Sequence, residues 1–317
     1  MGWELRAALL RELACREGFA AVEELAGALG QPRELVARAL RELMEEGYPV
    51  DQHPQLGYGF RGGDVADLAC CVHLLGRGLR FSLRYVERCS STQDVARALA
   101  EEGAEEGLVV VAEEQERGRG RRGRSWASAR GGLWLSILLR PGSPTLLGPL
   151  NLALGVAVAR AIRALYGLEA RLKWPNDVEV GGRKVAGVLV EAVSGPGHPL
   201  TAIAGIGVNV NNPLPEELRG RAAALAELLG RSLQRRPLLA RLLAEVDRVY
   251  TKLKADPRGI LEEWLSYSST IGRVVKVVAE DGEHYGVAAG LAEDGGLVVD
   301  IDGEKRIFHV GEVIHLR

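Results

Sequence analysis

The sequence lacks the features that would mark a membrane-bound or secreted protein. Its 317 residues contain no run of 18 uncharged apolar residues, which a membrane-spanning helix would need. The N-terminal stretch MGWELRAALLRELACREG is charged throughout and has no apolar core of the kind found in signal peptides. Arg6 stands where an N-myristoylation motif requires Ser or Thr. We therefore expect a cytoplasmic protein with no membrane partner.

Cysteine and lysine are both scarce. The four cysteines (Cys15, Cys70, Cys71 and Cys89) form no C-x-x-C pair and the six histidines are scattered, so we expect free thiols and no zinc site. There is also no excess of one charge, since the net charge is −2, and the whole chain is not built to coat DNA. With only six Lys against 34 Arg, each lysine is informative.

The N-terminal part has the pattern of a DNA-binding domain. Apolar periodicity predicts helices over 4–16, 22–29 and 33–46, and YPVDQHPQLGYGFRG predicts two short strands. Three helices followed by a hairpin predict a winged helix-turn-helix over 1–62, with Arg33, Arg38 and Arg41 as candidate DNA contacts. These residues carry seven Arg, no Lys and ten acidic residues, a net charge of −3. The alternative is a packing domain with weakened DNA binding, because each phosphate contact needs a cation.

The remainder predicts two further domains, so the expected fold class is a multidomain α+β protein. Over 63–268 we expect a linker helix with short turns at 63–80, a long apolar helix at about 145–166 and more helices over about 218–266, packed on a mixed sheet. The strands expected in this sheet are 107–112, 133–139, 186–192 and 201–210. From 271, strand runs separated by DG, EDGG and DGE turns predict a small β-barrel domain over 269–317.

The segment GRGRRGRSW, residues 118–126, combines three glycines, four arginines and a tryptophan. Glycines let backbone amides approach a ligand closely, and arginines bind phosphate or carboxylate through forked donors. The segment is neither a Walker A loop nor a dinucleotide fingerprint. A disordered basic surface is the alternative, but Trp126 directly after the arginines is suited to stacking on a base.

The segment KWPNDVEVGGRKVAGVLVE, residues 173–191, places two lysines beside a rigid turn. Pro175 excludes a helix, so Lys173, Asn176 and Asp177 should face one spot. A strand pair follows around Gly181–Gly182, and Lys184 lies at the start of an apolar strand, where its ammonium needs an anionic partner. Two lysines that extend to solvent from a plain hairpin are the alternative.

The segment CSSTQDVARALAEEG, residues 89–103, predicts the start of a helix. Ser91 and Asp94 have the spacing of a capping box. Capping alone would explain these residues, although a helix N-terminus is also an anion site.

Together these motifs resemble the biotin protein ligase family. The combination of GRGRRGRSW, KWPND with the following RK and AG, and Ser-Thr before a helix is highly specific, and the likeness covers essentially the whole chain. With a winged helix in front and a barrel behind, the chain resembles the bifunctional form, the biotin operon repressor. The resemblance implies a class II synthetase-like central domain and an SH3-like C-terminal barrel.

The family resemblance implies an ATP-dependent reaction in two steps. Biotin would first be activated to biotinyl-5′-AMP with release of pyrophosphate. The biotinyl group would then pass to a lysine of the biotin carboxyl carrier protein of acetyl-CoA carboxylase. ATP, biotin and Mg²⁺ are the expected ligands, without a tightly bound metal. A ligand-enhanced homodimer that binds operator DNA is the expected repressor.

The resemblance also implies a role for each matching residue. The catalytic residues would be Lys184, Arg121 and Arg119. The biotin-binding residues would be Ser91, Thr92, Gln93, Gln115, Arg119, Gly120, Arg121, Lys184 and Gly205. The residues that bind ATP or the adenylate would be Trp126, Lys173, Asn176, Asp177 and Asn209, with Mg²⁺ expected near Asp177.

This chain departs from the family pattern at two points. Gln93 stands where the family usually has Asn, and Gln31-Pro32 stands where the turn before the third helix usually has a small polar cap. Two other functions remain open: a ligand-sensing transcription regulator without ligase activity, and a lipoyl or octanoyl protein ligase. Intact Lys184, Arg121 and KWPND disfavour the first, and the GRGRRGRSW loop and the barrel disfavour the second.

Overall fold

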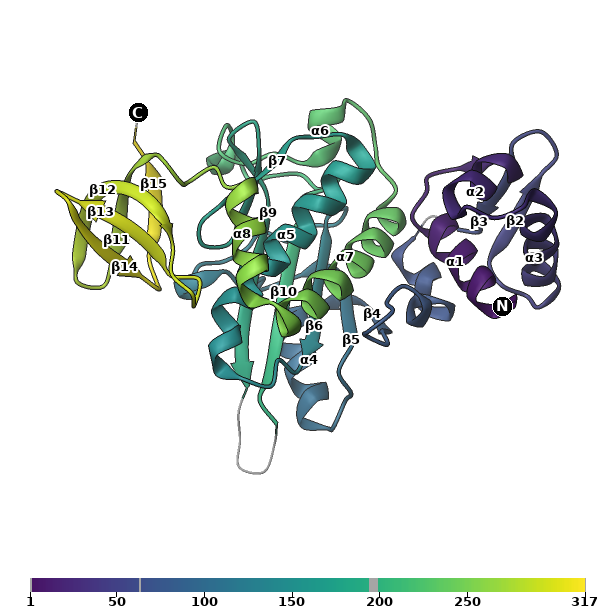
Figure 1. Cartoon of the computed structure of the whole chain (residues 1–317), viewed down its shortest axis with the longest axis horizontal. Helices are drawn as coiled ribbons and strands as arrows, with labels where there is room; N and C mark the ends of the chain where they lie inside the picture. The colour runs from purple at the N-terminus through teal and green to yellow at the C-terminus, as the bar shows by residue number, and fades with distance from the viewer. Residues whose placement is uncertain (1, 63, 194–198, 317) are drawn as a thin grey trace.

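The computed structural model describes residues 2–62, 64–193 and 199–316. Three sheets follow one another along the long axis of the molecule, with the N-terminal and C-terminal units at opposite ends (Figure 1). One continuous cluster of buried apolar residues runs from the first unit to the last. The domain boundaries at 62/63 and 268/269 therefore stay predictions.

The N-terminal unit has three helices and a small antiparallel sheet in the order β1-β3-β2. Its elements are α1 (Gly2–Ala14), β1 (Phe19–Ala20), α2 (Val22–Leu29), α3 (Arg33–Glu45), β2 (Val50–His53) and β3 (Gly57–Phe60). The α2 helix ends at Gly30, whose positive φ of 60° favours glycine. The element order matches the expected one, and β1 is an addition to it.

The segment after this unit corrects one expectation. Instead of a linker helix over 63–80, the described residues form two short 3₁₀ turns, Val65–Cys70 and Val72–Leu74. Asp247 then fixes the following loop, because its carboxylate accepts hydrogen bonds from the backbone N–H groups of Arg77, Gly78 and Leu79. Glycines at 76 and 78 break the apolar pattern that suggested a longer helix.

The central sheet is mixed, as expected, and has the order β4-β5-β6-β10-β9-β8-β7. Only the β4–β5 pair is parallel. The strands are β4 (Ser82–Cys89), β5 (Leu108–Gln115), β6 (Leu133–Leu139), β7 (Ala170–Lys173), β8 (Asp177–Val180), β9 (Arg183–Val193) and β10 (Thr201–Val208). Two strands were not predicted: β7, and β4, an edge strand whose residues are exposed or half-buried.

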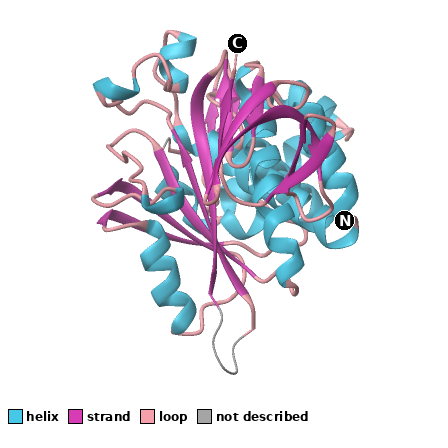
Figure 2. Ribbon diagram, turned by 90° about the vertical axis from the view of Figure 1, so that its left-hand side faces the viewer, coloured by secondary structure: helices cyan, strands magenta, loops and turns pink. Residues whose placement is uncertain are grey.

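Helices cover both faces of this sheet (Figure 2). The α4 helix (Thr92–Glu101) packs on one face against β5, β6 and β10. On the other lies α5 (Leu147–Tyr166), which packs against α7 (Arg235–Ala255) and α8 (Pro257–Tyr267), while α6 (Leu225–Leu229) is short. The segment Pro144–Tyr166 is long and apolar enough to cross a membrane, but 67% of its 18-residue apolar window is buried inside the protein, as in a core helix.

The expected capping box at α4 is incomplete. Ser91 is the N-cap, and its hydroxyl accepts the backbone N–H of Gln93 at 3.3 Å. Asp94 does not return to the N-cap backbone; it accepts a hydrogen bond from Ser90 Oγ at 2.9 Å and pairs with Arg119 at 3.0 Å. The loop arginine therefore takes the carboxylate that the capping box would have used.

The C-terminal unit is a five-stranded antiparallel sheet in the order β14-β13-β12-β11-β15. Its strands are β11 (Val274–Ala279), β12 (Gly282–Leu291), β13 (Leu297–Ile301), β14 (Glu304–Phe308) and β15 (Glu312–His315). Hydrogen bonds join it firmly to the central unit: Trp174 donates its backbone N–H to Thr270 Oγ1 at 3.1 Å and its indole N–H to Gly295 O at 3.0 Å.

Candidate active site

A cavity of about 190 Å³ opens between the central sheet, the loop after β5 and the start of β15. It gathers nearly all the residues that the sequence analysis assigned to biotin, ATP or catalysis. Those that line it are Ser91, Thr92, Gln93, Gln115, Arg119, Gly120, Arg121, Trp126, Lys173, Asn176, Asp177, Lys184 and Gly205. They come from α4, five strands and two loops, so only the tertiary fold brings them together.

Gln115, at the end of β5, organises the polar wall of the cavity. Its Oε1 accepts hydrogen bonds from the Thr92 backbone N–H at 2.8 Å, Thr92 Oγ1 at 3.1 Å and Ser91 Oγ at 3.3 Å. Its Nε2 donates to Ser128 Oγ at 2.7 Å. Ser91 and Thr92 are almost fully buried, so this wall of hydroxyl and amide groups is fixed before any ligand binds.

Gln93 fills the space that Gly205 leaves. A Cβ on Gly205 would lie 3.1 Å from Gln93 Cδ, so the side-chain amide rests on the glycine. Its Nε2 donates to Leu189 O and to Glu191 Oε2, both at 3.2 Å. Its Oε1 is buried and accepts no hydrogen bond from any residue that the structure describes. The longer glutamine is thus accommodated, and it presents an unsatisfied acceptor, which is costly to leave without a donor.

The four arginines of the loop have different partners. Arg119 pairs with Asp94 at 3.0 Å and Glu191 at 3.2 Å. Arg122 donates to Val278 O at 3.3 Å, and Arg124 pairs with Glu312, both partners lying in the C-terminal unit. Backbone bridges at Gln115–Ser128 and Arg119–Ser125 close the loop on itself. Arg119 therefore anchors the loop to α4 and β9, and Arg122 and Arg124 anchor it to the C-terminal unit.

Arg121 differs from its three neighbours. Its side chain lines the cavity, but its guanidinium forms no ion pair or hydrogen bond within the part of the chain that the structure describes. Burial lowers the pKa of its guanidinium, and the charge of Asp177 opposes that shift. A half-buried cation without a partner is an electrostatic cost that an anionic ligand would relieve. Arg121 is the loop residue best placed to meet a carboxylate or phosphate.

Trp126 rests on a floor of two glycines. Gly187 of β9 and Gly207 of β10 face each other across the strands, and a Cβ on either would come within 2.8 Å of the indole. The Nε1–H of Trp126 is buried without a hydrogen-bond partner among the described residues. Lys184 Nζ lies 4.8 Å from the ring centroid, which is cation–π distance.

The WPND turn carries the acidic side of the cavity. Lys184 Nζ lies 2.6 Å from Asp177 Oδ1, although the angle is not that of a hydrogen bond, and Asp177 Oδ1 accepts none. Lys173 lies 3.8 Å from Glu179, a carboxyl whose pKa burial raises. The anionic partner that Lys184 was expected to need is therefore supplied by the protein itself.

Asn176 holds the turn in place. Its side-chain Nδ2 donates to Val188 O at 2.9 Å, and its main-chain carbonyl accepts the backbone N–H of Val188 at 2.9 Å. The carbonyl of Pro175 accepts a hydrogen bond from Asn151 Nδ2 at 2.8 Å. Asn176 lines the cavity, but its amide group serves the turn.

Comparisons with known proteins agree with this geometry. Residues 85–211 match the model of the biotin/lipoate A/B protein ligase family, and residues 270–316 match the biotin protein ligase C-terminal domain. The bifunctional ligase/repressor BirA of Bacillus subtilis is 33% identical over 92% of each chain. The chain belongs to the biotin protein ligase family.

Other members of the family lack part of this chain's length. The biotin–[acetyl-CoA-carboxylase] ligase of Mycobacterium tuberculosis is 36% identical over 76% of this chain and 91% of its own. A biotin protein ligase from Aquifex aeolicus, solved with biotin and ATP, superposes with a TM-score of 0.66 at 34% identity over 74% of this chain and 98% of its own. Each of these matches covers about three quarters of this chain and more than nine tenths of the relative.

Asn209 is the predicted site residue that the structure leaves outside the cavity. It is buried, and its side-chain Oδ1 accepts a hydrogen bond from Asn212 Nδ2 at 3.3 Å. Its backbone N–H donates to Val185 O and its carbonyl accepts from Leu225. In this arrangement Asn209 fixes the end of β10, and its predicted contact with adenine stays a prediction.

Sequence reasoning missed two acidic residues of the site. Glu191 joins Gln93, Arg97 and Arg119 around one carboxylate. Glu312 of β15 lines the cavity and pairs with Arg124. Glu191 ends the apolar run AGVLV, where a charge is unusual, so a signal existed; Glu312 carried none, because its partner lies 188 residues away.

Proposed function

We propose that this chain is an ATP-dependent biotin–protein ligase that transfers biotin to the carrier protein of acetyl-CoA carboxylase. The observation that carries this proposal is the unpaired guanidinium of Arg121, which shares one cavity with Lys184 and with the polar wall around Gln115. A cation and a wall of amide and hydroxyl groups that line one cavity suit a ligand with an anionic tail and a polar ring.

In the first step, a carboxylate oxygen of biotin attacks the α-phosphorus of ATP. A new O–P bond forms, the bond to the β-phosphate oxygen breaks, and pyrophosphate leaves. Negative charge increases on the α-phosphate in the transition state, so fixed donors there accelerate the reaction. Arg121 and Lys184 are the cations that would supply them, and Lys184 can turn from Asp177 toward the phosphate.

In the second step, the amine of a carrier lysine attacks the carbonyl carbon of biotinyl-5′-AMP. An amide bond forms, the carbon–oxygen bond of the mixed anhydride breaks, and AMP and a proton leave. Neither step requires a covalent enzyme intermediate. The closed loop over residues 115–128 would shield the anhydride from water until the carrier arrives.

Asp177 fits the expected Mg²⁺. No cluster of three or more Cys, His, Asp or Glu side chains that could hold a metal occurs among the described residues. An ion would therefore share ligands with ATP, as Mg²⁺ usually does, and the Asp177 carboxylate would be open to it once Lys184 turns toward the phosphate. When bound there, it would neutralise phosphate charge.

Gln93 favours biotin over lipoate. Its buried Oε1 needs an N–H donor. The ureido ring of biotin has two N–H groups, whereas the dithiolane of lipoate has none and would leave the acceptor unsatisfied. A site built for a hydrogen bond rejects analogues that lack the donor more strongly than an apolar pocket does.

A repressor role is the second proposed function. The relatives called ligase/repressor match 92% of this chain, and neither matched family model covers residues 1–84. We therefore assign the N-terminal unit as a winged helix that binds operator DNA from a ligand-enhanced dimer. A role in transcription and the carrier protein as partner both imply a cytoplasmic location.

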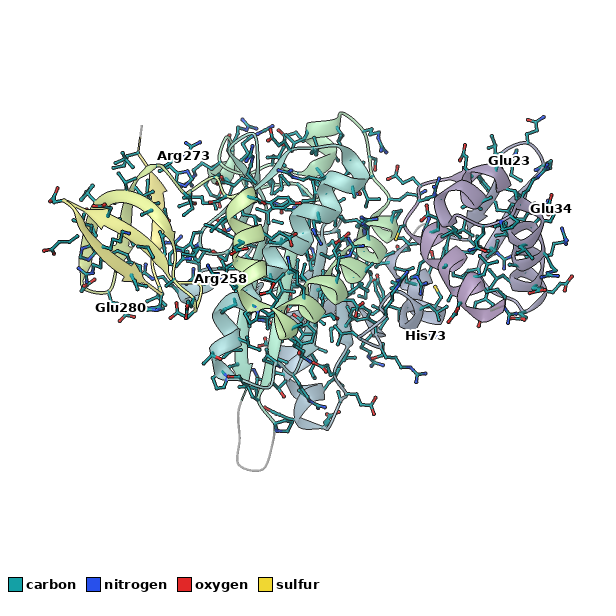
Figure 3. All side chains as sticks on the ribbon, viewed as in Figure 1. Glu23, Glu34, His73, Arg258, Arg273 and Glu280 are labelled. Carbon is teal, nitrogen blue, oxygen red and sulfur yellow. The ribbon has the colours of Figure 1, made fainter. Side chains whose placement is uncertain are left out.

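The charge of α3 makes a single winged helix a weak DNA binder. Arg33 pairs with Glu23 at 2.9 Å, Arg38 lies 3.8 Å from Glu42, and Arg41 has no ion pair in the described ranges. Glu34 lies on the outer end of the unit, and Glu23 on its surface as well (Figure 3). Because phosphate binding depends on positive charge, one such unit should bind DNA weakly by itself. Two copies in one dimer would gain affinity for DNA through effective concentration.

Mass spectrometry of a carrier domain tests the ligase proposal. The protein is incubated with ATP, Mg²⁺, the apo carrier domain of acetyl-CoA carboxylase and either biotin or lipoate. We expect one biotinyl group on one carrier lysine and no lipoyl group. Lipoyl transfer would favour the lipoyl ligase, and no transfer despite biotin binding would favour a regulator without ligase activity.

A further inference from the structure

Arg236, in the first turn of α7, is a buried charge that the proposed reaction does not use. Its side chain is 1% exposed, and it does not line the cavity. A buried guanidinium needs compensation, yet within the described part of the chain no carboxylate forms an ion pair with it. Burial lowers its pKa from the usual arginine value.

Backbone carbonyls of the N-terminal unit compensate the charge. Nη1 donates to Ala14 O at 2.7 Å and Leu13 O at 3.3 Å, and Nη2 donates to Arg16 O at 3.0 Å. Leu13 and Ala14 are the last residues of α1, where the helix dipole is negative. The Leu13 carbonyl also accepts the backbone N–H of Arg16 at 3.2 Å. Nε donates to Gly62 O at 3.0 Å.

The ring of Phe60 completes this binding site, with its centroid 4.7 Å from the guanidinium carbon. Arg236 therefore touches the end of α1, the last residue of β3 and the segment that leaves the unit. All three nitrogens of the guanidinium are used, and every acceptor comes from residues 13–62.

Arg235, the preceding residue, binds the central sheet instead. Its Nη1 and Nη2 lie 3.1 and 2.7 Å from the carboxylate oxygens of Glu113 on β5, and Nη1 donates to Gly132 O at 3.0 Å. One turn of α7 thus holds the sheet with one arginine and the N-terminal unit with the next. Other links at this junction, such as Arg231 with Glu17, are more exposed.

We propose that Arg236 is a positioning residue that fixes the orientation of the N-terminal unit on the central unit. Without it, α1 loses the cation at its C-terminal end, and the connection depends on the apolar packing between the units, the surface pairs and the segment around Gly62. The consequence for DNA rests on the proposed repressor function: a dimer reads two half-sites at a fixed spacing only if each winged helix keeps its orientation.

Hydrogen–deuterium exchange of the full chain tests the proposal. In Arg236→Met, amides of residues 13–17 and 58–62 should exchange at least tenfold faster, while β5, β6 and β10 keep wild-type protection. Arg236→Lys, which keeps the charge but reaches fewer carbonyls, should give a smaller local increase. Arg231→Met is the matched control on the same junction, and it should change little because exposed pairs contribute little.

The outcomes separate positioning from general stability. Unchanged exchange at residues 13–17 in Arg236→Met would overturn the proposal. A uniform increase across both units in the Met and Lys variants would overturn it as well, because Arg236 would then stabilise the whole chain. Biotin-dependent pyrophosphate release should stay within twofold of wild type, since Arg236 is remote from the cavity.

DNA binding forms a second, separable arm. The probe is a duplex selected from a random pool by the wild-type protein with biotin and ATP. Changing its half-site spacing by one base pair should weaken wild-type binding strongly and Arg236→Met binding little. If the wild type selects no duplex, the repressor proposal fails while the exchange experiment still decides the role of Arg236.

Discussion

Replacing Arg121 with Met should separate ligand binding from folding. The guanidinium lines the cavity without a partner, and burial already lowers its pKa. Removing it takes away no contact that stabilises the apo protein, so the apo melting temperature should not fall. Hydrogen bonds to a charged group contribute about 1.5–3 kcal/mol, so affinity for biotin's carboxylate or the adenylate phosphate should drop roughly tenfold to 150-fold.

Isothermal titration calorimetry measures this effect directly. Biotin and a non-hydrolysable analogue of biotinyl-5′-AMP are titrated into wild type, Arg121→Met and Arg122→Met. The Arg122 variant is the matched control, because this neighbour also lines the cavity but its guanidinium donates to Val278 O. It should bind both ligands within about threefold of wild type, since its guanidinium already has a partner in the protein.

Two results would refute the reasoning about Arg121. Unchanged affinity of Arg121→Met for both ligands would show that the cation does not face an anion. A lower apo melting temperature would show that the side chain stabilises the fold. If the variant still makes the adenylate but holds it poorly, free biotinyl-5′-AMP should escape and label lysines of a bystander protein such as albumin.

Three further substitutions test other parts of the site. Lys184→Ala should keep its fold by circular dichroism but lose roughly 10²–10³ in the rate of pyrophosphate release, the usual effect of removing one transition-state donor; a normal rate would exclude Lys184 from the first step. Glu191→Gln should weaken biotin binding in calorimetry, because the carboxylate that orders Arg119 and Gln93 loses its charge. Unchanged biotin affinity, together with unchanged hydrogen–deuterium exchange of the loop amides at 118–126, would show that Glu191 does not have this role. Gly207→Ala should shift tryptophan fluorescence and reduce ATP affinity, since its Cβ would come within 2.8 Å of the Trp126 ring; a wild-type spectrum would show that the indole does not rest on this floor.

The sequence predicted those parts of the site that depend on local backbone chemistry. Glycine and proline mark the loop at 118–126 and the turn at 173–177, and the structure places both at one cavity. The alternation and spacing of apolar residues predicted most of the sheet and the long helix α5 in the same way. These signals are local, so they can be detected along the chain.

The remaining features depend on partners distant in the sequence. Four arginines in one loop look equivalent until Glu191, Glu312 and Val278 O are placed, and only then does Arg121 stand apart. The strand β4 pairs on one side only, so its residues show no clean alternation. Asp94 was expected to complete a capping box, but Arg119 takes its carboxylate.

Exchange of radioactive pyrophosphate into ATP tests the central claim most directly, because it reports the first half-reaction without a carrier protein. The protein is incubated with ATP, Mg²⁺, labelled pyrophosphate and biotin, lipoate or no acid. We expect exchange that depends on biotin and is lost in Lys184→Ala. Exchange with lipoate in place of biotin, or tight biotin binding with no exchange at all, would contradict the account.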